Sequence, residues 1–375
     1  MTNGSGEVIA VTGGNSLIGQ HLIKWLVENG QSIAVIRVWH PTQKFVKRIE
    51  MDETRSISVE GFVGQEYFER FLDGASTVFN LHEVWDFSLQ PNKKKMWEEN
   101  VNAVERLMTA CRAAKVARVV HLSSAFVNTS IRWPNTNLVE LTEMPPKSEA
   151  PFPDYIDSKI ESERIVFEYD DIQTFAVRLC PLIGEGDQSS IVCDALRFAQ
   201  WNKLSQSLPV IGDRGGVLQI TYAGNAASGL ARVMEKMIEQ PTLTKEVVFV
   251  VDDAPKKDVF TFMEPLLEAR GVPISSAIRV PFFFAYVLYW LIVSPLLFIS
   301  QIVPLPSSVA RLPSLAVLYM TFYHWTFFSP NKSRLLLDWV PPFDYRQAMR
   351  RSAAYYKSLD VASLPESTRS WCCVE

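Results

Sequence analysis

The chain has 375 residues, of which 47% are hydrophobic, and 37 Lys and Arg against 41 Asp and Glu give a formal net charge of −4. This length allows one elaborated domain or two closely joined ones. The acidic balance argues against a nucleic-acid partner, which needs a basic stripe. The five cysteines include no CxxC pair, so the sequence predicts neither a disulfide framework nor a metal site.

The first predicted unit is a strand, a glycine-rich turn and a helix. Residues 7–11 form a short apolar run, and apolar residues recur at helical spacing between 17 and 26. In such a turn, glycines let the backbone approach a pyrophosphate while helix N-terminal amides bind its charge. A plain tight turn is the alternative. We predict that a dinucleotide is bound by Gly13, Gly14, Ser16, Leu17, Ile18 and Gly19.

The second predicted strand, residues 33–38, carries Arg37 near its end. An acidic residue at this place would accept both ribose hydroxyls of NAD, whereas a guanidinium suits the 2′-phosphate of NADP. We therefore expect NADP or NAD as the cofactor, with NADP favoured. Stacking on the adenine and a plain surface position are the alternatives for Arg37.

Strands and helices continue to alternate beyond this point. We predict strands at residues 57–59, 78–81, 117–122, 175–178 and 247–251, and helices at 67–72, 101–114, 155–168 and 258–271. This alternation is typical of an α/β fold with a doubly wound parallel Rossmann sheet. We expect a dinucleotide-binding domain at 1–180, a mainly substrate-binding portion at 181–279, a hydrophobic segment at 280–330, a return to the substrate portion at 331–362, and an unstructured tail at 363–375.

Tyr155 and Lys159 stand four residues apart on a predicted helix, so both side chains face the same way. A neighbouring ammonium favours the phenolate. Lowering a tyrosine pKa by about 3 units requires roughly 4 kcal/mol, which the ammonium and a cationic nicotinamide could supply together. Such a phenolate would accept the proton of a carbinol during hydride transfer. Ser124, at the end of a buried strand, is expected to bind the substrate oxygen, with Ser123 as the rival assignment. Asn102 is expected to link the backbone to a water leading to Lys159, an exposed helical asparagine being the alternative.

One segment differs in composition from the rest of the chain. Residues 280–310 contain no Lys, Arg, Asp or Glu and are rich in aromatic side chains, and residues 315–328 carry only His324 as an ionisable group. The first stretch is long enough to cross a bilayer, although Pro295 interrupts it. A kinked span, a re-entrant hairpin, a segment in the membrane interface and a buried helical hairpin all remain open.

These residues, in this order, resemble the extended short-chain dehydrogenase/reductase family. Further stretches narrow the resemblance to its 3β-hydroxysteroid dehydrogenase/isomerase branch, namely VVHLSS at 119–124, YIDSK at 155–159 with Glu163, Arg178 with GEG at 184–186, YAGNA at 222–226 and VVDDAP at 250–255. The resemblance covers about residues 7–360, and members of this branch also carry a hydrophobic membrane-associated segment at the place of 280–310.

The resemblance implies oxidation of a 3β-hydroxysteroid or sterol to the 3-ketone, with isomerisation of a 5-ene to a 4-ene left open. Tyr155 would be the general base and acid, Lys159 its partner and a ribose ligand, and Ser124 the substrate-oxygen binder. The implied partners are the steroid or sterol and a lipid bilayer, with a homodimer left open. We expect an intracellular protein on the endoplasmic reticulum membrane, with its catalytic domain on the cytoplasmic side. Decarboxylation of a 4-carboxysterol, reduction of another lipid carbonyl, and a dinucleotide-binding membrane scaffold are the alternatives.

The chain also departs from that pattern. Ser16 replaces a glycine, Arg37 an acidic ribose ligand, Phe62 an adenine-contacting aspartate and Leu179 a proline. His82 and Glu83 stand where small residues usually line the cofactor cleft. We expect these substitutions to bear most on how the dinucleotide is held.

Overall fold

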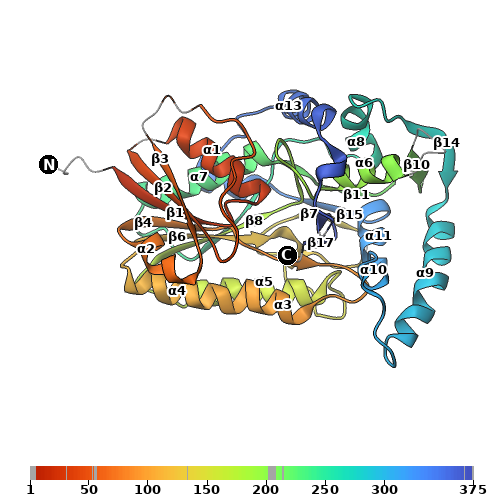
Figure 1. Cartoon of the computed structure of the whole chain (residues 1–375), viewed down its shortest axis with the longest axis horizontal. Coiled ribbons are helices and arrows are strands. Elements are labelled where there is room, and N and C mark those ends of the chain that lie inside the picture. Colours follow the sequence, from red (N-terminus) through yellow and green to blue (C-terminus); the bar gives the residue numbers. More distant parts are fainter. Residues whose placement is uncertain are drawn as a thin grey trace.

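The computed structural model describes residues 6–30, 32–52, 54, 57–132, 134–201, 208–212, 215–366 and 368–373, without the side chains of 275–278. Its centre is a seven-stranded sheet in the order β13-β8-β6-β4-β1-β2-β3 (Figure 1). Every pairing in this sheet is parallel. The predicted doubly wound fold is therefore confirmed. The strands are β1 (Glu7–Thr12), β2 (Ile33–His40), β3 (Ser58–Val63), β4 (Ala75–Asn80), β6 (Arg118–Ser124), β8 (Gln173–Leu179) and β13 (Glu246–Val250).

Helices cover both faces of the sheet, as is typical of parallel sheets. One face packs against α1 (Leu17–Asn29) and α7 (Ala223–Glu239), and its core contains Leu22, Phe79 and Leu230. The other face packs against α2 (Phe68–Leu72), α4 (Ala103–Ala113) and α5 (Pro153–Phe167). The short helix α3 (Lys93–Trp97) and the π-helical turn η2 (Glu98–Asn102) lead into α4.

The boundary expected at residue 180 does not divide the chain cleanly. Helix α7 and strand β13 both lie within 181–279, yet they belong to the central sheet and its helical cover. Because β8 would otherwise be an edge strand, β13 shields its unpaired backbone groups.

A smaller portion stands at the carboxyl ends of the strands. It contains α6 (Ile191–Trp201), α8 (Val259–Glu268) and α13 (Tyr345–Ser358), which share a second hydrophobic core with Leu266 and Tyr356. Small sheets join it to the rest, built from β7 (Asn135–Leu138), β9 (Leu182–Ile183), β10 (Leu208–Ile211), β11 (Val217–Leu218), β12 (Thr221–Tyr222), β14 (Ile274–Val280) and β15 (Trp325–Phe328). The short element η4 (Val361–Ser363) packs against α6 in this portion. The other short elements are η1 (Gln65–Tyr67), next to α2, η3 (Ala125–Asn128), next to α5, and α12 (Asn331–Leu337), which packs against β13 and α7.

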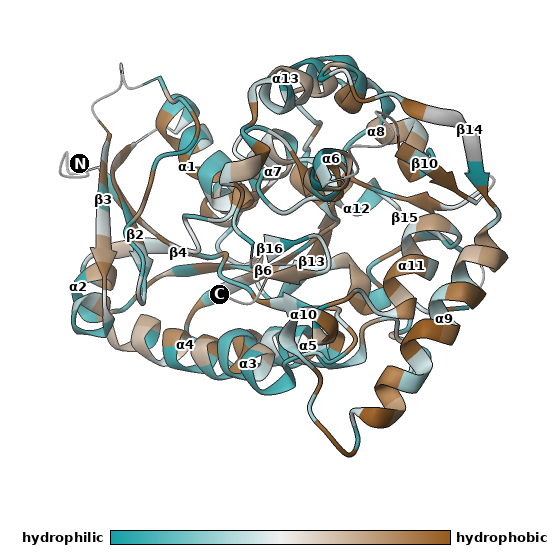
Figure 2. Ribbon diagram, turned by 45° about the vertical axis from the view of Figure 1, so that its right-hand side comes forward, coloured by the Kyte–Doolittle hydropathy of each residue, from teal (hydrophilic) through white to brown (hydrophobic). Residues whose placement is uncertain are grey.

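The hydrophobic segment forms α9 (Phe282–Ile299), α10 (Ser307–Ala310) and α11 (Leu315–Phe322) at one end of the molecule (Figure 1). Helix α9 is mostly hydrophobic, with a few polar positions (Figure 2), and only 11% of it is buried. Its length and apolar composition are sufficient to cross a membrane. The buried helical hairpin is wrong, because a buried hairpin would cover both helices and α9 is mostly exposed.

The tail expected to be unstructured is instead ordered over residues 368–373. Strands β16 (Thr368–Arg369) and β17 (Cys372–Cys373) form a hairpin that pairs with β5 (Trp85–Asp86). The Asp194 carboxylate accepts a hydrogen bond from the amide of Ser370 at 2.8 Å, and the Trp371 indole donates to the carbonyl of Arg311. We call residues 361–373 the C-terminal strap. Its hydrogen bonds to three separate parts of the chain explain its order.

Candidate active site

A cavity of about 900 Å³ opens at the carboxyl ends of the strands, where ligands bind in doubly wound sheets. One end is formed by the glycine turn and the loop after β2, and the other by Ser124, Tyr155, aromatic side chains, α11 and the strap. The two ends are continuous past His82. Ligands bound next to each other in this cavity could therefore extend from the glycine turn to Tyr155.

The glycine turn is built for close backbone approach. Gly13 has a φ of +68°, and a Cβ there would lie 2.6 Å from the backbone nitrogen of His82, so only glycine fits. Ser16 caps α1: its hydroxyl accepts from the amide of Gly19 at 3.1 Å and donates to the carbonyl of Gly13 at 2.7 Å. A Cβ at Gly19 would meet Gly13, and one at Gly14 would meet Val38.

The turn can therefore hold a diphosphate. Gly13, Ser16, Leu17 and Ile18 line the cavity, whereas Gly14 and Gly19 lie behind it and keep the turn tight. First-turn amides have no acceptor within a helix and favour an anion. Ser16, in place of a glycine, uses its hydroxyl to bind the amide of Gly19, and the first-turn residues that line the cavity are Leu17 and Ile18. We conclude that this end of the cavity fits a dinucleotide.

Arg37 lies away from this cavity, and the expectation of a 2′-phosphate contact is corrected. Strand β2 ends at His40, three residues beyond Arg37. The Arg37 guanidinium donates to the carbonyls of Arg70 and Asp73 at the end of α2 and pairs with Glu60 at 3.4 Å. The short strand predicted from the sequence misplaced its end, and this removes the basis of the NADP preference.

The residues at the true end of β2 do line the cavity. They are His40, Pro41, Thr42, Gln43, Lys44, Val46 and Arg48. The Nδ1 atom of His40 accepts from the amides of Thr42 and Gln43 at 3.2 and 2.9 Å, which fixes this loop. Phe62 packs on the α2 side of the sheet, and the Arg37 guanidinium lies 6.0 Å from its ring. Phe62 is not among the residues that line the cavity, so its side chain does not reach the place where a dinucleotide would bind.

Tyr155, Lys159 and Ser124 are brought together as the spacing predicts. Tyr155 and Lys159 lie on α5, with side chains 5% and 1% exposed, and Ser124 ends β6 beside them. Lys159 Nζ donates to the carbonyl of Leu122 at 2.7 Å. Ser123 also lines the cavity, and its buried hydroxyl has no partner among the described residues. Ser124 caps η3 by accepting from the amide of Phe126.

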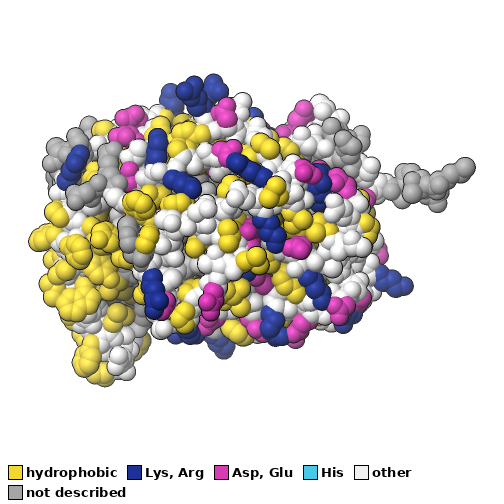
Figure 3. Space-filling model, turned by 180° about the vertical axis from the view of Figure 1, so that it is seen from behind, with side chains coloured by type: hydrophobic (Ala, Val, Ile, Leu, Met, Phe, Trp, Pro, Cys, Tyr) yellow, Lys and Arg dark blue, Asp and Glu magenta, His cyan; other side chains and the backbone are white. Residues whose placement is uncertain are grey.

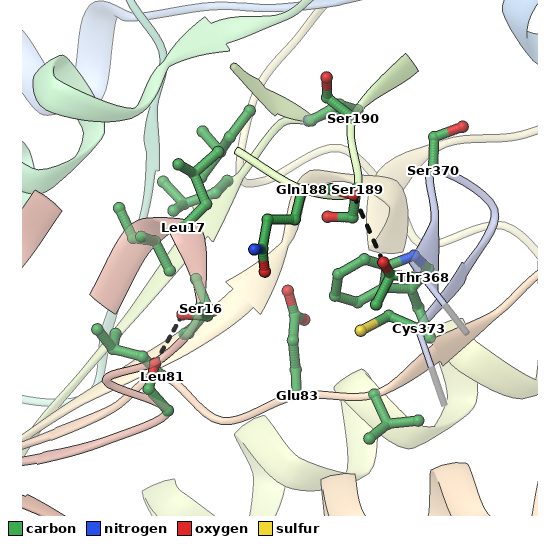
Figure 4. A pocket seen from close by; sticks show the side chains of 18 of the residues that line it. Ser16, Leu17, Leu81, Glu83, Gln188, Ser189, Ser190, Thr368, Ser370 and Cys373 are labelled. Atoms are coloured by element: carbon green, nitrogen blue, oxygen red, sulfur yellow. Dashed lines mark hydrogen bonds between the residues drawn. The ribbon is translucent and has the colours of Figure 1, made fainter. Parts of the chain in front are cut away.

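Sequence reasoning did not assign Glu83 a contact with these residues. The Tyr155 hydroxyl donates to Glu83 Oε2 at 3.0 Å, and Lys159 Nζ lies 3.2 Å from the same oxygen. Figure 4 shows Glu83 reaching into the cavity from the segment that follows β4. The sequence held one signal for this contact: Glu83 is large, whereas the resemblance implies a small residue at this place.

The Glu83 contact opposes the expected phenolate. Burial and the Glu83 carboxylate raise the pKa of Tyr155 well above its usual value, and a hydrogen bond with Ser124 acts weakly in the opposite direction. Glu83 neutralises the Lys159 ammonium that was expected to lower the pKa. In the structure Tyr155 is therefore a phenol, and a proton acceptor has to be sought beside it.

The helical asparagine that serves this site is Asn100, and the assignment of Asn102 is corrected. Asn100 is 2% exposed. Its side chain donates to the carbonyl of Val84 at 2.8 Å and to Ser158 Oγ at 3.0 Å, and accepts from the amide of Val84 at 2.9 Å. Asn102 instead donates to Glu98 on the outer surface. Both residues lie in the π-helical turn, whose wider winding a regular helical projection does not reproduce.

His82 is among the residues that line the cavity. Its Nε2 lies 3.0 Å from Glu99 Oε2, and its ring meets His40 edge to face at 6.0 Å. Since the cavity lining includes residues on both sides of His82, the imidazole forms part of the wall.

Comparison with known proteins agrees with this architecture. Residues 10–282 match the 3-beta hydroxysteroid dehydrogenase/isomerase family. The chain is 24% identical to the mouse (Mus musculus) protein named sterol-4-alpha-carboxylate 3-dehydrogenase, decarboxylating, over 93% of this chain and 91% of the relative. It is also 24% identical to the 3 beta-hydroxysteroid dehydrogenase/Delta 5→4-isomerase of Mycobacterium tuberculosis, covering 96% and 92%.

Among solved structures, UDP-glucuronic acid 4-epimerase from Bacillus cereus, in complex with UDP-glucuronic acid and NAD, superposes with a TM-score of 0.63. The two sequences are 15% identical, and the match covers 93% of this chain and 99% of the epimerase. At this identity the likeness concerns the fold.

Proposed function

Since the chain belongs to the 3-beta hydroxysteroid dehydrogenase/isomerase family, we propose that it oxidises the 3β-hydroxyl of a steroid or sterol to a ketone with a nicotinamide dinucleotide. The convergence of Ser124 and Tyr155 on one cavity with the glycine turn carries this proposal. A bound oxidised dinucleotide supplies the acceptor for the hydride. The chain's own residues bind the carbinol oxygen through Ser124 and move its proton through Tyr155.

The glycine turn and the amides of Leu17 and Ile18 would hold the diphosphate. NAD is supported because the superposed epimerase binds it. With Arg37 engaged elsewhere, the described cations that line this end of the cavity are Lys44 and Arg48. The ratio of kcat/KM for NAD and NADP measures the choice.

The other half of the cavity suits a fused-ring lipid. It is lined by Phe87, Phe126, Phe152, Val317 and Met320, which offer apolar and aromatic surface. Phe87 and Phe152 stack with ring centroids 3.9 Å apart, and Phe87 meets the Tyr155 ring edge to face. An extended apolar ligand held on these rings would present its terminal carbinol to Ser124 and Tyr155.

The cavity is connected to the exposed apolar surface by one helix. Val317 and Met320 are on α11, which packs against α9. Hydrophobic side chains gather at the end of the molecule where α9 lies (Figure 3). They include Phe283, Phe284, Leu291, Ile292 and Phe298, each more than half exposed. We propose that this surface rests on or enters a lipid bilayer, and that it delivers the substrate to α11 without aqueous transit. The endoplasmic reticulum, with the catalytic part on the cytoplasmic side, is the membrane we propose.

A 4-carboxysterol is the second candidate, favoured by the name of the mouse relative. Oxidation at C3 of such a substrate gives a β-keto acid, which loses carbon dioxide readily. A carboxylate would require a cation near Ser124. Among the described residues the lysine and arginine that line the cavity, Lys44 and Arg48, are both in the loop after β2. The apolar substrate end therefore favours a neutral ring system.

The test is steady-state reduction of NAD and NADP with purified protein in detergent or vesicles. The substrates are a panel of 3β-hydroxysteroids, 4-carboxysterols and unrelated lipid alcohols. We expect turnover of 3β-hydroxysteroids, loss of at least 1,000-fold in Tyr155→Phe, and little change in dinucleotide affinity. Ultraviolet absorbance of a conjugated enone would reveal isomerisation. Dinucleotide binding without turnover of any lipid alcohol would instead indicate a membrane scaffold and refute the proposal.

A further inference from the structure

The Glu83 carboxylate touches both side chains on which the proposed chemistry depends. Its Oε2 accepts from the Tyr155 hydroxyl at 3.0 Å and lies 3.2 Å from Lys159 Nζ. Tyr155 and Lys159 are almost fully buried, whereas Glu83 is 21% exposed and lines the cavity. The carboxylate therefore connects a buried phenol and ammonium to the cavity interior.

The backbone around Glu83 is fixed on both sides. Asn100 forms hydrogen bonds with the amide and the carbonyl of Val84. On the other side, Thr12 Oγ1 accepts from the amides of Leu81 and His82 at 3.2 and 3.3 Å. Buried hydrogen bonds of this kind hold a segment in one conformation. The contact of Glu83 with Tyr155 therefore belongs to the architecture of the site.

Few charges other than Glu83 and Lys159 face the phenol. Ser124 approaches it from β6, and Phe87 contributes only its ring edge. On α5, Asp154 pairs with Lys93 and Asp157 pairs with Lys147. Across the cavity wall, Glu99 pairs with His82. Glu83 is thus the carboxylate hydrogen-bonded to the Tyr155 hydroxyl in the part of the chain that the structure describes.

We propose that Glu83 is a positioning residue that takes the phenolic proton of Tyr155 while Tyr155 takes the proton of the substrate carbinol. This rests on the proposed oxidation. The carbinol O–H bond breaks and a new O–H bond forms on Tyr155; the former Tyr155 proton forms an O–H bond with Glu83. The hydride, with its electron pair, leaves for the oxidised nicotinamide dinucleotide. Once protonated, Glu83 is neutral, and the Lys159 ammonium faces a neutral acid. This arrangement favours return of the proton to Tyr155 in the reverse reaction.

The relay removes the need for a free phenolate. A phenol with a raised pKa is almost entirely protonated at neutral pH, and as a lone base it would make oxidation increase tenfold with each pH unit. With a carboxylate as the proton acceptor, oxidation is expected to depend little on pH between 6 and 9. Glu83→Gln removes the acceptor and releases Lys159 to act on Tyr155, so the phenol pKa falls and oxidation must await its ionisation.

The experiment measures kcat/KM for oxidation from pH 6 to 9 in wild type, Glu83→Gln and Glu83→Asp. We expect a flat profile in wild type. In Glu83→Gln, kcat/KM at pH 6 falls at least tenfold and recovers as pH rises. The ionisation of Tyr155 is measured separately, as the difference in tyrosinate absorbance between Glu83→Gln and Glu83→Gln/Tyr155→Phe. We expect the two pH midpoints to be equal. Glu83→Asp keeps a carboxylate and keeps a flat profile at reduced rate. Glu143→Gln, an exposed residue away from the cavity, is the control for the charge change.

A flat profile in Glu83→Gln, or a Tyr155 titration identical to that of wild type, would overturn the relay. So would tighter dinucleotide binding together with faster oxidation in Glu83→Gln, because that result identifies Glu83 as an obstruction to the cofactor. The tyrosinate titration requires no steroid. Dinucleotide affinity, which is measured by fluorescence, requires none either. They decide the role of Glu83 even if no steroid is turned over and the proposed function fails.

Discussion

Replacement of Asn100 by alanine is expected to destabilise the protein far more than the same change two residues later. Asn100 is buried and satisfies both backbone groups of Val84. Each buried polar group left unpaired costs about 1–3 kcal/mol, so for two groups we expect a loss of about 2–6 kcal/mol in the free energy of unfolding. Ser158 keeps its bond to the carbonyl of Tyr155 and adds little to this loss.

Asn102→Ala is the matched control. Asn102 donates to Glu98 at the surface, and Glu98 also pairs with Arg106, so its loss is expected to change stability by less than about 0.5 kcal/mol. Both substitutions replace the same residue type within one helical turn, so their propensity effects are comparable and largely cancel.

Urea unfolding followed by tryptophan fluorescence, in one detergent, measures the two free energies. Dinucleotide oxidoreduction should also fall in Asn100→Ala, because the segment that carries Glu83 loses its clamp. Stabilities of the two variants that agree within about 1 kcal/mol would refute the assignment of Asn100 as the residue that fixes this segment.

Two further predictions concern residues outside the catalytic group. Arg37→Asp is expected to leave the ratio of kcat/KM for NAD and NADP unchanged. It should lower the free energy of unfolding by about 1–2 kcal/mol, because it removes donors from the carbonyls at the end of α2. A shift of the ratio toward NAD would restore Arg37 to the cofactor site. Replacing Phe283, Leu291 and Phe298 together by serine is expected to reduce binding to phospholipid vesicles at least tenfold in a flotation assay. Leu335→Ser is the control and should have no effect, because Leu335 is 83% exposed but lies outside α9. Equal binding by both variants would exclude α9 as the contact with lipid.

The sequence was informative where a motif is local. The strand, turn and helix around Gly13 and the Tyr155–Lys159 pair depend on short-range spacing, and the structure places them as expected. The alternation of strands and helices likewise predicted the parallel sheet. These features need no knowledge of which distant segments meet.

The errors arose where tertiary contacts decide. Arg37 was placed at the end of β2 because the apolar pattern stops at residue 38, yet pairing with β1 and β3 extends the strand to His40. Asn100 and Asn102 are indistinguishable on a regular helix and separate only in a π-helical turn. The strap has little apolar pattern of its own and is ordered by Asp194, Arg311 and β5. Glu83 could be recognised as bulky, but its contact with Tyr155 joins residues far apart in the chain.

The π-helical turn makes this helix sensitive to changes in length as well as in residue type. A π turn contains one more residue than the α turn it replaces, so deletion of a single residue within 98–102 would restore regular winding. Because the deletion removes the extra residue that the π turn accommodates, α3 and α4 would keep their relative orientation. The residues inside the turn would shift, and Asn100 would lose the position from which its amide reaches Val84. A frame-preserving deletion of one codon there would thus disable the site and leave a protein with nearly unchanged helix content.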